Sequence, residues 1–126
     1  MNSAGTRLRV LLVDDDAKMV RLVRSILRDD GYEVVGLTSA VDAMTQIETL
    51  DPHVVVLDKV MPERDGLDVA EDIREVRPDQ PIVIFSSLFD RRLSLETRRL
   101  GYVYCEKAGG IDQLEDAIRE AVSRAS

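Results

Sequence analysis

The chain has 126 residues, of which 44% are hydrophobic and 33% are charged, a composition typical of one globular domain rather than a disordered segment. Its 24 acidic residues outnumber its 17 basic residues and give a formal net charge of -7, which argues against direct binding to nucleic acid. One cysteine excludes an internal disulfide, and without a signal-peptide pattern or an apolar run that could span a bilayer we expect a soluble, cytoplasmic protein that binds no membrane.

The first half of the chain alternates apolar runs with amphipathic patterns. Residues 8–13 predict a strand, and the next segment predicts a helix that ends at Gly31. Residues 33–37 predict a second strand and residues 40–50 a second helix. Residues 54–57, a continuous apolar run, predict a strand that is covered on both faces. The apolar face of the first helix is expected to hold Met19, Leu22, Val23, Ile26 and Leu27.

The second half repeats this alternation after a loop over residues 58–66. A third helix is expected to point Val69, Ala70, Ile73 and Val76 inward. The remaining predicted elements are a strand over residues 82–85, a helix over 90–99, a strand over 102–105 and a helix over 111–124. Five such strand–helix units predict an α/β fold, a parallel sheet with helices on both faces.

Polar residues stand at the carboxyl ends of four predicted strands. They are Asp14 and Asp15 after the first, Asp58 after the third, Ser86 after the fourth and Lys107 after the fifth. In an open α/β sheet these ends meet at one edge, where ligands bind. Clustered carboxylates repel one another unless a cation joins them, and an open set of oxygen ligands suits Mg²⁺. A hydroxyl and an ammonium beside the cation would stabilise a transferring phosphoryl group.

These residues, with the run from Asp58 to Pro62, the Asp65–Gly66 pair and Tyr104 three residues before Lys107, resemble the receiver domain of two-component response regulators. The resemblance covers about residues 8–122 and implies one receiver domain over residues 1–126. It also implies a doubly wound, flavodoxin-like fold with five parallel strands in the order 2-1-3-4-5.

The resemblance also implies a role for each site residue. Asp58 would be the phosphoacceptor, supplied by a histidine kinase or a histidine phosphotransfer protein. Mg²⁺ would be held by Asp15, Asp58 and the backbone carbonyl of Val60, with Asp14 assisting through water.

Three further roles follow from the same resemblance. Lys107 would pair with the phosphoryl oxygens, Ser86 would move to hydrogen-bond them, and Tyr104 would follow inward. The surface of the fourth helix, fifth strand and fifth helix would then bind an output protein or a fused effector domain. The resemblance also implies that two phosphorylated copies of the chain could form a homodimer. The chain would be no enzyme beyond catalysing its own phosphorylation and dephosphorylation.

Two positions depart from the family pattern. Ala108 replaces the usual proline after Lys107 and is followed by two glycines, and Lys59 stands where an apolar residue is commoner. Because a cis bond before a non-proline residue costs about 2.5–4 kcal/mol, we expect the Lys107–Ala108 peptide to be trans.

Two other functions stay open. Asp14, Asp15 and Asp16 echo the motif of haloacid-dehalogenase-like phosphatases, but Lys18 replaces the Thr or Val of that motif, and its late acidic pair and cap domain are missing. The second alternative is a receiver-like module that interacts without phosphate. Loss of Asp58, Asp15 or Lys107 would have favoured it, and all three are present.

Other polar residues have simpler interpretations. Asp16 is expected to cap a helix, Ser87 to be structural, Cys105 to pack in the core and His53 to lie at the surface. Two arginine pairs seven residues apart predict one stripe on the fourth helix, either a solvated face or a surface that docks an acidic partner or a second copy of the domain: Arg91 and Arg92, and Arg98 and Arg99.

Overall fold

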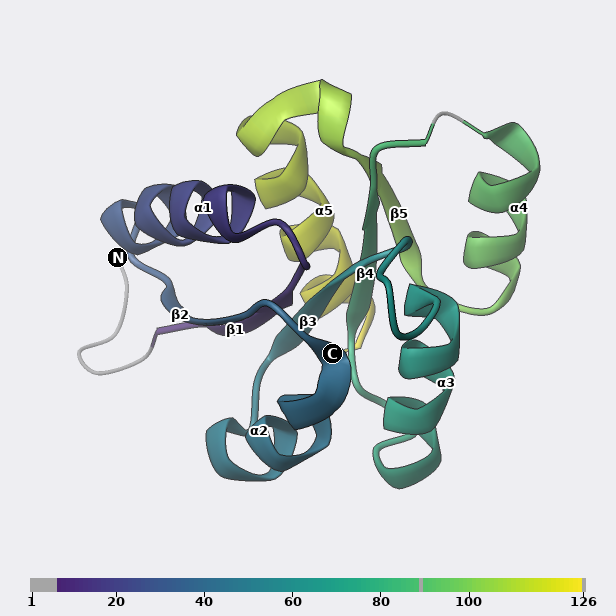
Figure 1. Cartoon of the computed structure of the whole chain (residues 1–126), viewed down its shortest axis with the longest axis horizontal. Coiled ribbons are helices and arrows are strands. Elements are labelled where there is room, and N and C mark those ends of the chain that lie inside the picture. The colour runs from purple at the N-terminus through teal and green to yellow at the C-terminus, as the bar shows by residue number, and fades with distance from the viewer. Residues whose placement is uncertain (1–6, 89, 126) are drawn as a thin grey trace.

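The computed structural model describes residues 7–88 and 90–125, in which strands and helices alternate as the sequence predicts (Figure 1). The strands are β1 (Arg9–Val13), β2 (Glu33–Leu37), β3 (Val54–Asp58), β4 (Ile82–Ser86) and β5 (Val103–Glu106). The α-helices are α1 (Ala17–Asp29), α2 (Ala43–Leu50), α3 (Gly66–Val76), α4 (Arg91–Arg99) and α5 (Gly110–Arg124). Short 3-10 turns precede α2 and α5: η1 (Ala40–Asp42) and η2 (Lys107–Gly109).

The five strands form one parallel sheet in the order β2-β1-β3-β4-β5, which confirms the predicted fold class. β1 pairs with both β2 and β3, so the chain proceeds outward from it in two directions. The strand order therefore reverses between β1 and β3. At such a reversal the connections leave the sheet on opposite faces and open a crevice at the carboxyl ends of the strands.

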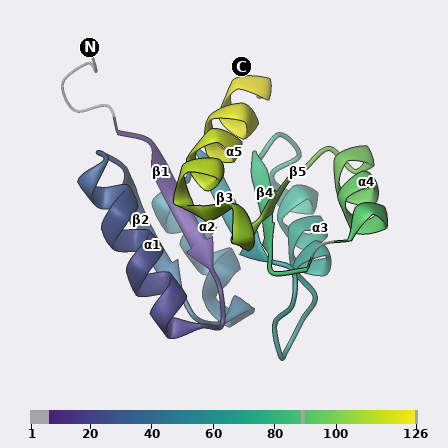
Figure 2. The same cartoon turned by 90° about the horizontal axis from the view of Figure 1, so that it is seen from above.

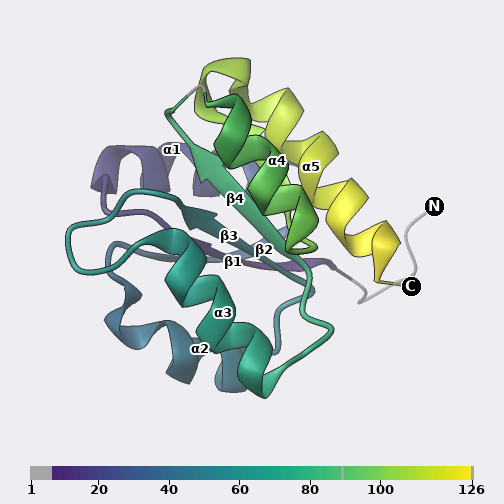
Figure 3. The same ribbon diagram turned by 90° about the vertical axis from the view of Figure 1, so that its right-hand side faces the viewer.

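The helices form a layer on each face of the sheet. α1 and α5 cover one face, and α2 and α3 cover the other (Figure 3). α4 contacts β5 and lies at the opposite end of the molecule from α1 (Figure 2).

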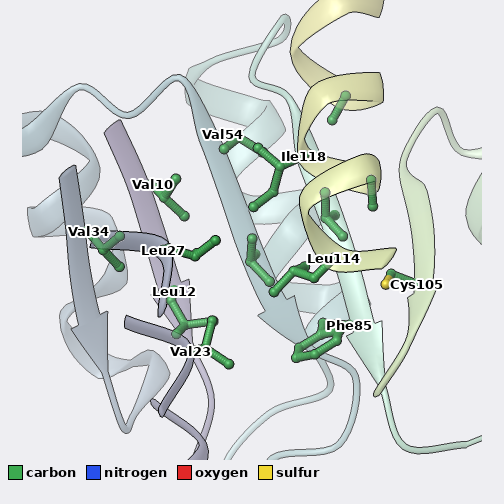
Figure 4. Close-up of a cluster of buried hydrophobic side chains, with 14 of the residues drawn as sticks. Val10, Leu12, Val23, Leu27, Val34, Val54, Phe85, Cys105, Leu114 and Ile118 are labelled. Carbon is green, nitrogen blue, oxygen red and sulfur yellow. The ribbon is translucent and has the colours of Figure 1, made fainter. Parts of the chain in front are cut away.

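Each layer buries its own hydrophobic cluster. On the α1 and α5 side, Leu27, Leu114 and Ile118 pack against strand residues that include Val10 and Phe85 (Figure 4). On the other side, Ile47 of α2 and Ile73 of α3 pack against Leu11, Leu57 and Ile84. Full burial of a side chain of this size contributes about 1.5–3 kcal/mol to the free energy of folding, so the two clusters stabilise the sheet beneath the site.

Acidic residues begin three of the helices. The Asp16 carboxylate accepts hydrogen bonds from the backbone N–H groups of Lys18 and Met19, which confirms its predicted capping role. Asp65 and Asp90 cap α3 and α4 in the same way. α1 ends where Gly31 adopts a φ of 100°, a conformation that favours glycine.

Three details of the sequence prediction were wrong. Leu22 and Val76 were expected to face inward but are 53% and 61% exposed. Leu22 lies away from the narrow stripe of Val20, Val23 and Leu27 that α1 buries, and Val76 is the last residue of α3. The predicted helix over residues 40–50 is divided into η1 and α2.

Within the described residues, no helix combines the length and the apolar character that crossing a membrane requires.

Candidate functional site

The polar residues that follow the predicted strands lie together at the carboxyl edge of the sheet. Asp14 directly follows β1, Asp58 ends β3 and Ser86 ends β4, while Lys107 opens η2 after β5. The register pairs Asp58 with Phe85 and Ser86 with Glu106, so these strands end almost level. The parallel sheet therefore brings together residues that are far apart in sequence.

Three carboxylates form an acidic cluster at this edge. Asp14, Asp15 and Asp58 each offer an oxygen, and these oxygens lie within 4.8 Å of one another. Asp14 and Asp58 are buried and Asp15 is exposed, so the cluster opens to solvent on one side. Such a set of oxygen donors with an open side fits a divalent cation of the kind that retains water ligands.

Lys107 joins two members of the cluster. Its Nζ lies 2.7 Å from Oδ2 of Asp14 and 3.4 Å from Oδ1 of Asp58. The other oxygen of Asp14 accepts a hydrogen bond of 2.9 Å from the backbone N–H of Asp16, which fixes the carboxylate at the start of α1. The Nζ of Lys107 also lies over the Phe85 ring, 5.6 Å from its centroid.

The close packing of these charged groups changes the pKa of both Asp58 and Lys107. Burial, and next the negative charge of Asp14, raise the pKa of Asp58 to about 6, although Lys107 and the Val60 N–H oppose the increase. Burial alone would lower the pKa of Lys107, but its hydrogen bond and attraction to Asp14, together with Asp58, raise it. At neutral pH the site therefore holds a charged lysine between carboxylates that repel each other.

The loop from β3 to α3 is held tightly against the end of β3. The backbone N–H of Gly66 donates to the carbonyl of Lys59 over 2.8 Å, and a Cβ at Gly66 would lie only 2.2 Å from the carbonyl oxygen of Asp58. Val60 forms a bridge with Asp65 across the loop. Position 66 therefore accepts only glycine without a shift of the backbone.

The sequence did not reveal the position of the Lys59 side chain. Its Nζ forms an ion pair of 2.5 Å with Oδ2 of Asp65, and Oδ1 of Asp65 accepts from the N–H of Leu67 at the start of α3. Lys59 therefore closes the loop through the cap of α3 and does not pair with Asp58. A basic residue after an acidic strand end is the only trace of this contact in the sequence.

Ser86 and Tyr104 are connected through the backbone of Leu88. The Oγ of Ser86 accepts a hydrogen bond of 3.0 Å from the Leu88 N–H, and the Tyr104 hydroxyl donates to the Leu88 carbonyl over 2.5 Å. Burial raises the pKa of Tyr104, and the nearby Ser86 hydroxyl opposes the increase. Sequence reasoning missed Leu88 as a link because backbone groups make both bonds.

The remaining candidates lie outside the cluster. Ser87 is exposed, and the Nδ1 of His53 accepts from the Arg9 N–H at the opposite, amino end of the strands. Cys105 is buried in the core as predicted, and burial raises the pKa of its thiol to about 11. No cis peptide occurs among the described residues, which confirms the trans bond expected between Lys107 and Ala108.

Comparison with known proteins gives consistent matches. A family model described as "Response regulator receiver domain" matches residues 10–119. The chemotaxis protein CheY of Thermotoga maritima is 33% identical over 94 residues, which cover 74% of this chain and 78% of that protein. A protein-glutamate methylesterase/protein-glutamine glutaminase of Rhodospirillum rubrum is 35% identical over 127 residues, which cover 94% of this chain and 34% of that protein.

A solved structure of a response regulator protein also resembles the chain. The chain resembles a response regulator protein of Thermotoga maritima in complex with Mg²⁺–BeF, with a TM-score of 0.79 and 26% sequence identity, over 90% of this chain and 98% of the other. Several curated relatives are longer than the chain, which spans 57% of a transcriptional regulatory protein and 34% of the methylesterase.

Proposed function

Because this chain belongs to the response regulator receiver domain family, we propose that it is switched by transfer of a phosphoryl group to Asp58 in the presence of Mg²⁺. The observation that carries this proposal is the position of Lys107, whose ammonium lies between Asp14 and Asp58. The oxygens of a phosphoryl group on Asp58 would need a positively charged partner, and the Lys107 ammonium stands where it could pair with them.

The metal ligands in this proposal are Asp15, Asp58 and the carbonyl of Val60, with Asp14 acting through a bound water. The oxygen donors within 4.8 Å of one another support it, and Mg²⁺ would neutralise charge on the phosphoryl oxygens when bound. The tight contact between Gly66 and Asp58 keeps the β3–α3 loop, and with it Val60, beside the cluster.

The chemical step requires an ionised Asp58. With a pKa near 6 its carboxylate is mostly charged at neutral pH, and an oxygen of it attacks the phosphorus of the donor. The bond between phosphorus and the histidine nitrogen of the donor breaks as the bond to Asp58 forms, and the nitrogen keeps the electron pair of the broken bond. Lys107 exchanges part of its contact with Asp58 for the new phosphoryl oxygens and stays paired with Asp14.

The proposed switch then involves Ser86 and Tyr104. Ser86 would release the Leu88 N–H and turn its hydroxyl toward the phosphoryl group, and Tyr104 would leave the Leu88 carbonyl and move inward. These movements would alter the surface formed by α4, β5 and α5, which would bind an output protein or a fused effector domain. Phosphorylation could also bring two copies of the chain together through this surface.

The donor in this proposal is a histidine kinase or a histidine phosphotransfer protein in the cytoplasm. We further propose that residues 1–126 form one receiver domain with a core over about residues 8–122. Its role would be signalling and not turnover of a separate substrate, although the relatives that match it include a methylesterase.

The test is the intact mass of the protein after incubation with acetyl phosphate and Mg²⁺. The expected result is a gain of one phosphoryl group by the natural chain and by Asp79→Asn, which removes an exposed carboxylate outside the cluster. Asp58→Asn should show no gain. Uptake by Asp58→Asn would place the acceptor elsewhere, and no uptake by the natural chain would favour a module that works without phosphate.

A further inference from the structure

A groove lies between the start of α3 and α4, two helices on the same side of the molecule (Figure 1). It has a volume of about 680 Å³, and α4 contributes Arg92, Leu95 and Arg99 to it. The other flank of α4 contributes Arg91 and Arg98 to a separate hollow shared with β5 and α5. This α3–α4 groove is therefore distinct from the surface of α4, β5 and α5.

The groove exposes apolar side chains that a folded domain usually covers. Leu95 is 60% exposed and Leu88 is 44% exposed, and both line it together with Leu67. Leu93 is buried and forms part of its floor. Two exposed leucines, with half-buried Leu67 beside them, form a compact apolar surface of the kind that binds another protein.

The cationic side chains that the groove offers to a partner are Arg92 and Arg99. Arg92 and Arg99 stand seven residues apart on one flank of α4, and neither forms an ion pair with a carboxylate of the described residues. Asp65 is engaged by Lys59 and by the cap of α3, and Asp90 caps α4.

Glu96 is the remaining acidic residue of the lining, and it stands between the two arginines in sequence. The lining therefore carries three cationic and three anionic side chains, and Arg92 and Arg99 are the two cations without an ion pair among the described residues.

We propose that the α3–α4 groove docks an amphipathic helix of a partner protein that presents leucine-like side chains flanked by carboxylates. The apolar residues would enter between Leu88 and Leu95, and the carboxylates would pair with Arg92 and Arg99. A phosphate backbone would leave the leucines without apolar partners, and a chain of net charge -7 repels nucleic acid at a distance. An anionic membrane would need a wider apolar face than these leucines provide.

The groove is also connected to the proposed switch. Leu88 lines the groove, and its N–H and carbonyl are the groups that hold Ser86 and Tyr104. This step rests on the proposed function: if Ser86 and Tyr104 leave Leu88 on phosphorylation, the Leu88 side chain moves and one wall of the groove changes. Binding in the groove is therefore expected to change several-fold when Asp58 is phosphorylated.

The test measures fluorescence anisotropy of a labelled synthetic peptide of about 18 residues titrated with the full chain. The peptide repeats leucine at helical spacing with glutamates beside it, and a twin carries glutamine in place of every glutamate. Arg92→Gln combined with Arg99→Gln is compared with Arg91→Gln combined with Arg98→Gln. The second pair removes the same charge from the same helix on its other flank, which makes it a matched control.

The glutamate peptide should bind the natural chain, and the Arg92 and Arg99 double variant and the glutamine peptide should each weaken binding about threefold to tenfold. The Arg91 and Arg98 double variant should stay within about twofold of the natural chain. Equal loss in the two double variants, equal binding of both peptides, or no binding at about 1 mM protein would overturn the proposal. Tighter binding of a DNA duplex or of anionic vesicles would overturn it as well.

The dependence on phosphorylation is measured separately, after the mass of the protein has shown that acetyl phosphate labels it. Unchanged peptide affinity in the labelled protein would remove the connection through Leu88 and leave docking in the groove intact. Absence of labelling would contradict the proposed function while the peptide titrations on the unlabelled chain still decide whether the groove binds.

Discussion

Replacing Asp58 by asparagine should stabilise the metal-free domain at alkaline pH. The carboxylate of Asp58 is buried and close to that of Asp14, and Lys107 offsets only part of the unfavourable energy because its nearer partner is Asp14. Asparagine keeps the shape of the side chain and removes the charge. Lys107 would keep its contact of 2.7 Å with Asp14 in the variant.

The size of the effect follows from the pKa of Asp58, which rises from an ordinary value of 3.8 to about 6 in the folded state. The folded protein thus binds this proton more tightly than the unfolded chain, so protonated Asp58 adds stability that is complete below about pH 4 and is lost as the pH rises through 6. The full difference is worth about 3 kcal/mol at pH 8 and about half of that at pH 5. Asp58→Asn should therefore raise the free energy of unfolding by about 2–3 kcal/mol at pH 8 and by about 1–2 kcal/mol at pH 5.

Urea unfolding at the two pH values, in the presence of a chelator, measures this difference directly. Asp79→Asn serves as the control, because it removes an exposed carboxylate away from the cluster. A gain in stability that is absent at pH 8, or one that is larger at pH 5 than at pH 8, would show that Asp58 and Asp14 do not repel each other as proposed.

Three further outcomes are expected. Mg²⁺ should raise the melting temperature of the natural chain because it binds only the folded acidic cluster, and identical melting curves with Mg²⁺ and with a chelator would contradict that site. Gly66→Ala should lower the free energy of unfolding by about 1–3 kcal/mol, since the new Cβ would meet the Asp58 carbonyl oxygen at 2.2 Å, and unaltered urea curves would show that the loop yields easily. Val60→Asn or Leu88→Glu should shorten the lifetime of phosphorylated Asp58 by orienting a water for attack, and loss of label that is faster in the natural chain would disprove this.

The sheet and the convergence of the site could be predicted because both depend on simple rules. Apolar runs marked the strands, and polar residues directly after them had to meet at one edge once the strands were parallel. Asp14, Asp58 and Ser86 stand at strand ends, and Lys107 reaches the first two through a long side chain. Strand order came from the resemblance to a known family, since the pattern of the residues contains no information on which strands pair.

The contacts that sequence reasoning missed depend on side-chain direction and backbone geometry. Lys59 could have turned toward Asp58 or toward Asp65, and only the fold of the loop decides between them. Leu88 links Ser86 and Tyr104 through its N–H and carbonyl, which every non-proline residue possesses, so its identity carries no trace of the role. The helical spacing likewise placed Leu22 on the inward face of the helix, but it did not show that α1 buries only a narrow stripe of residues.

The environment of Cys105 makes the chain convenient for site-specific labelling. With a thiol pKa of about 11, only about one molecule in several thousand carries the reactive thiolate at pH 7.5, and the sulfur is buried against α5 as well. A maleimide dye should therefore react with a cysteine introduced on the exposed side of α4 and leave Cys105 untouched. With a second cysteine introduced at another exposed position, the distance between the two dyes could be followed in solution without first removing Cys105.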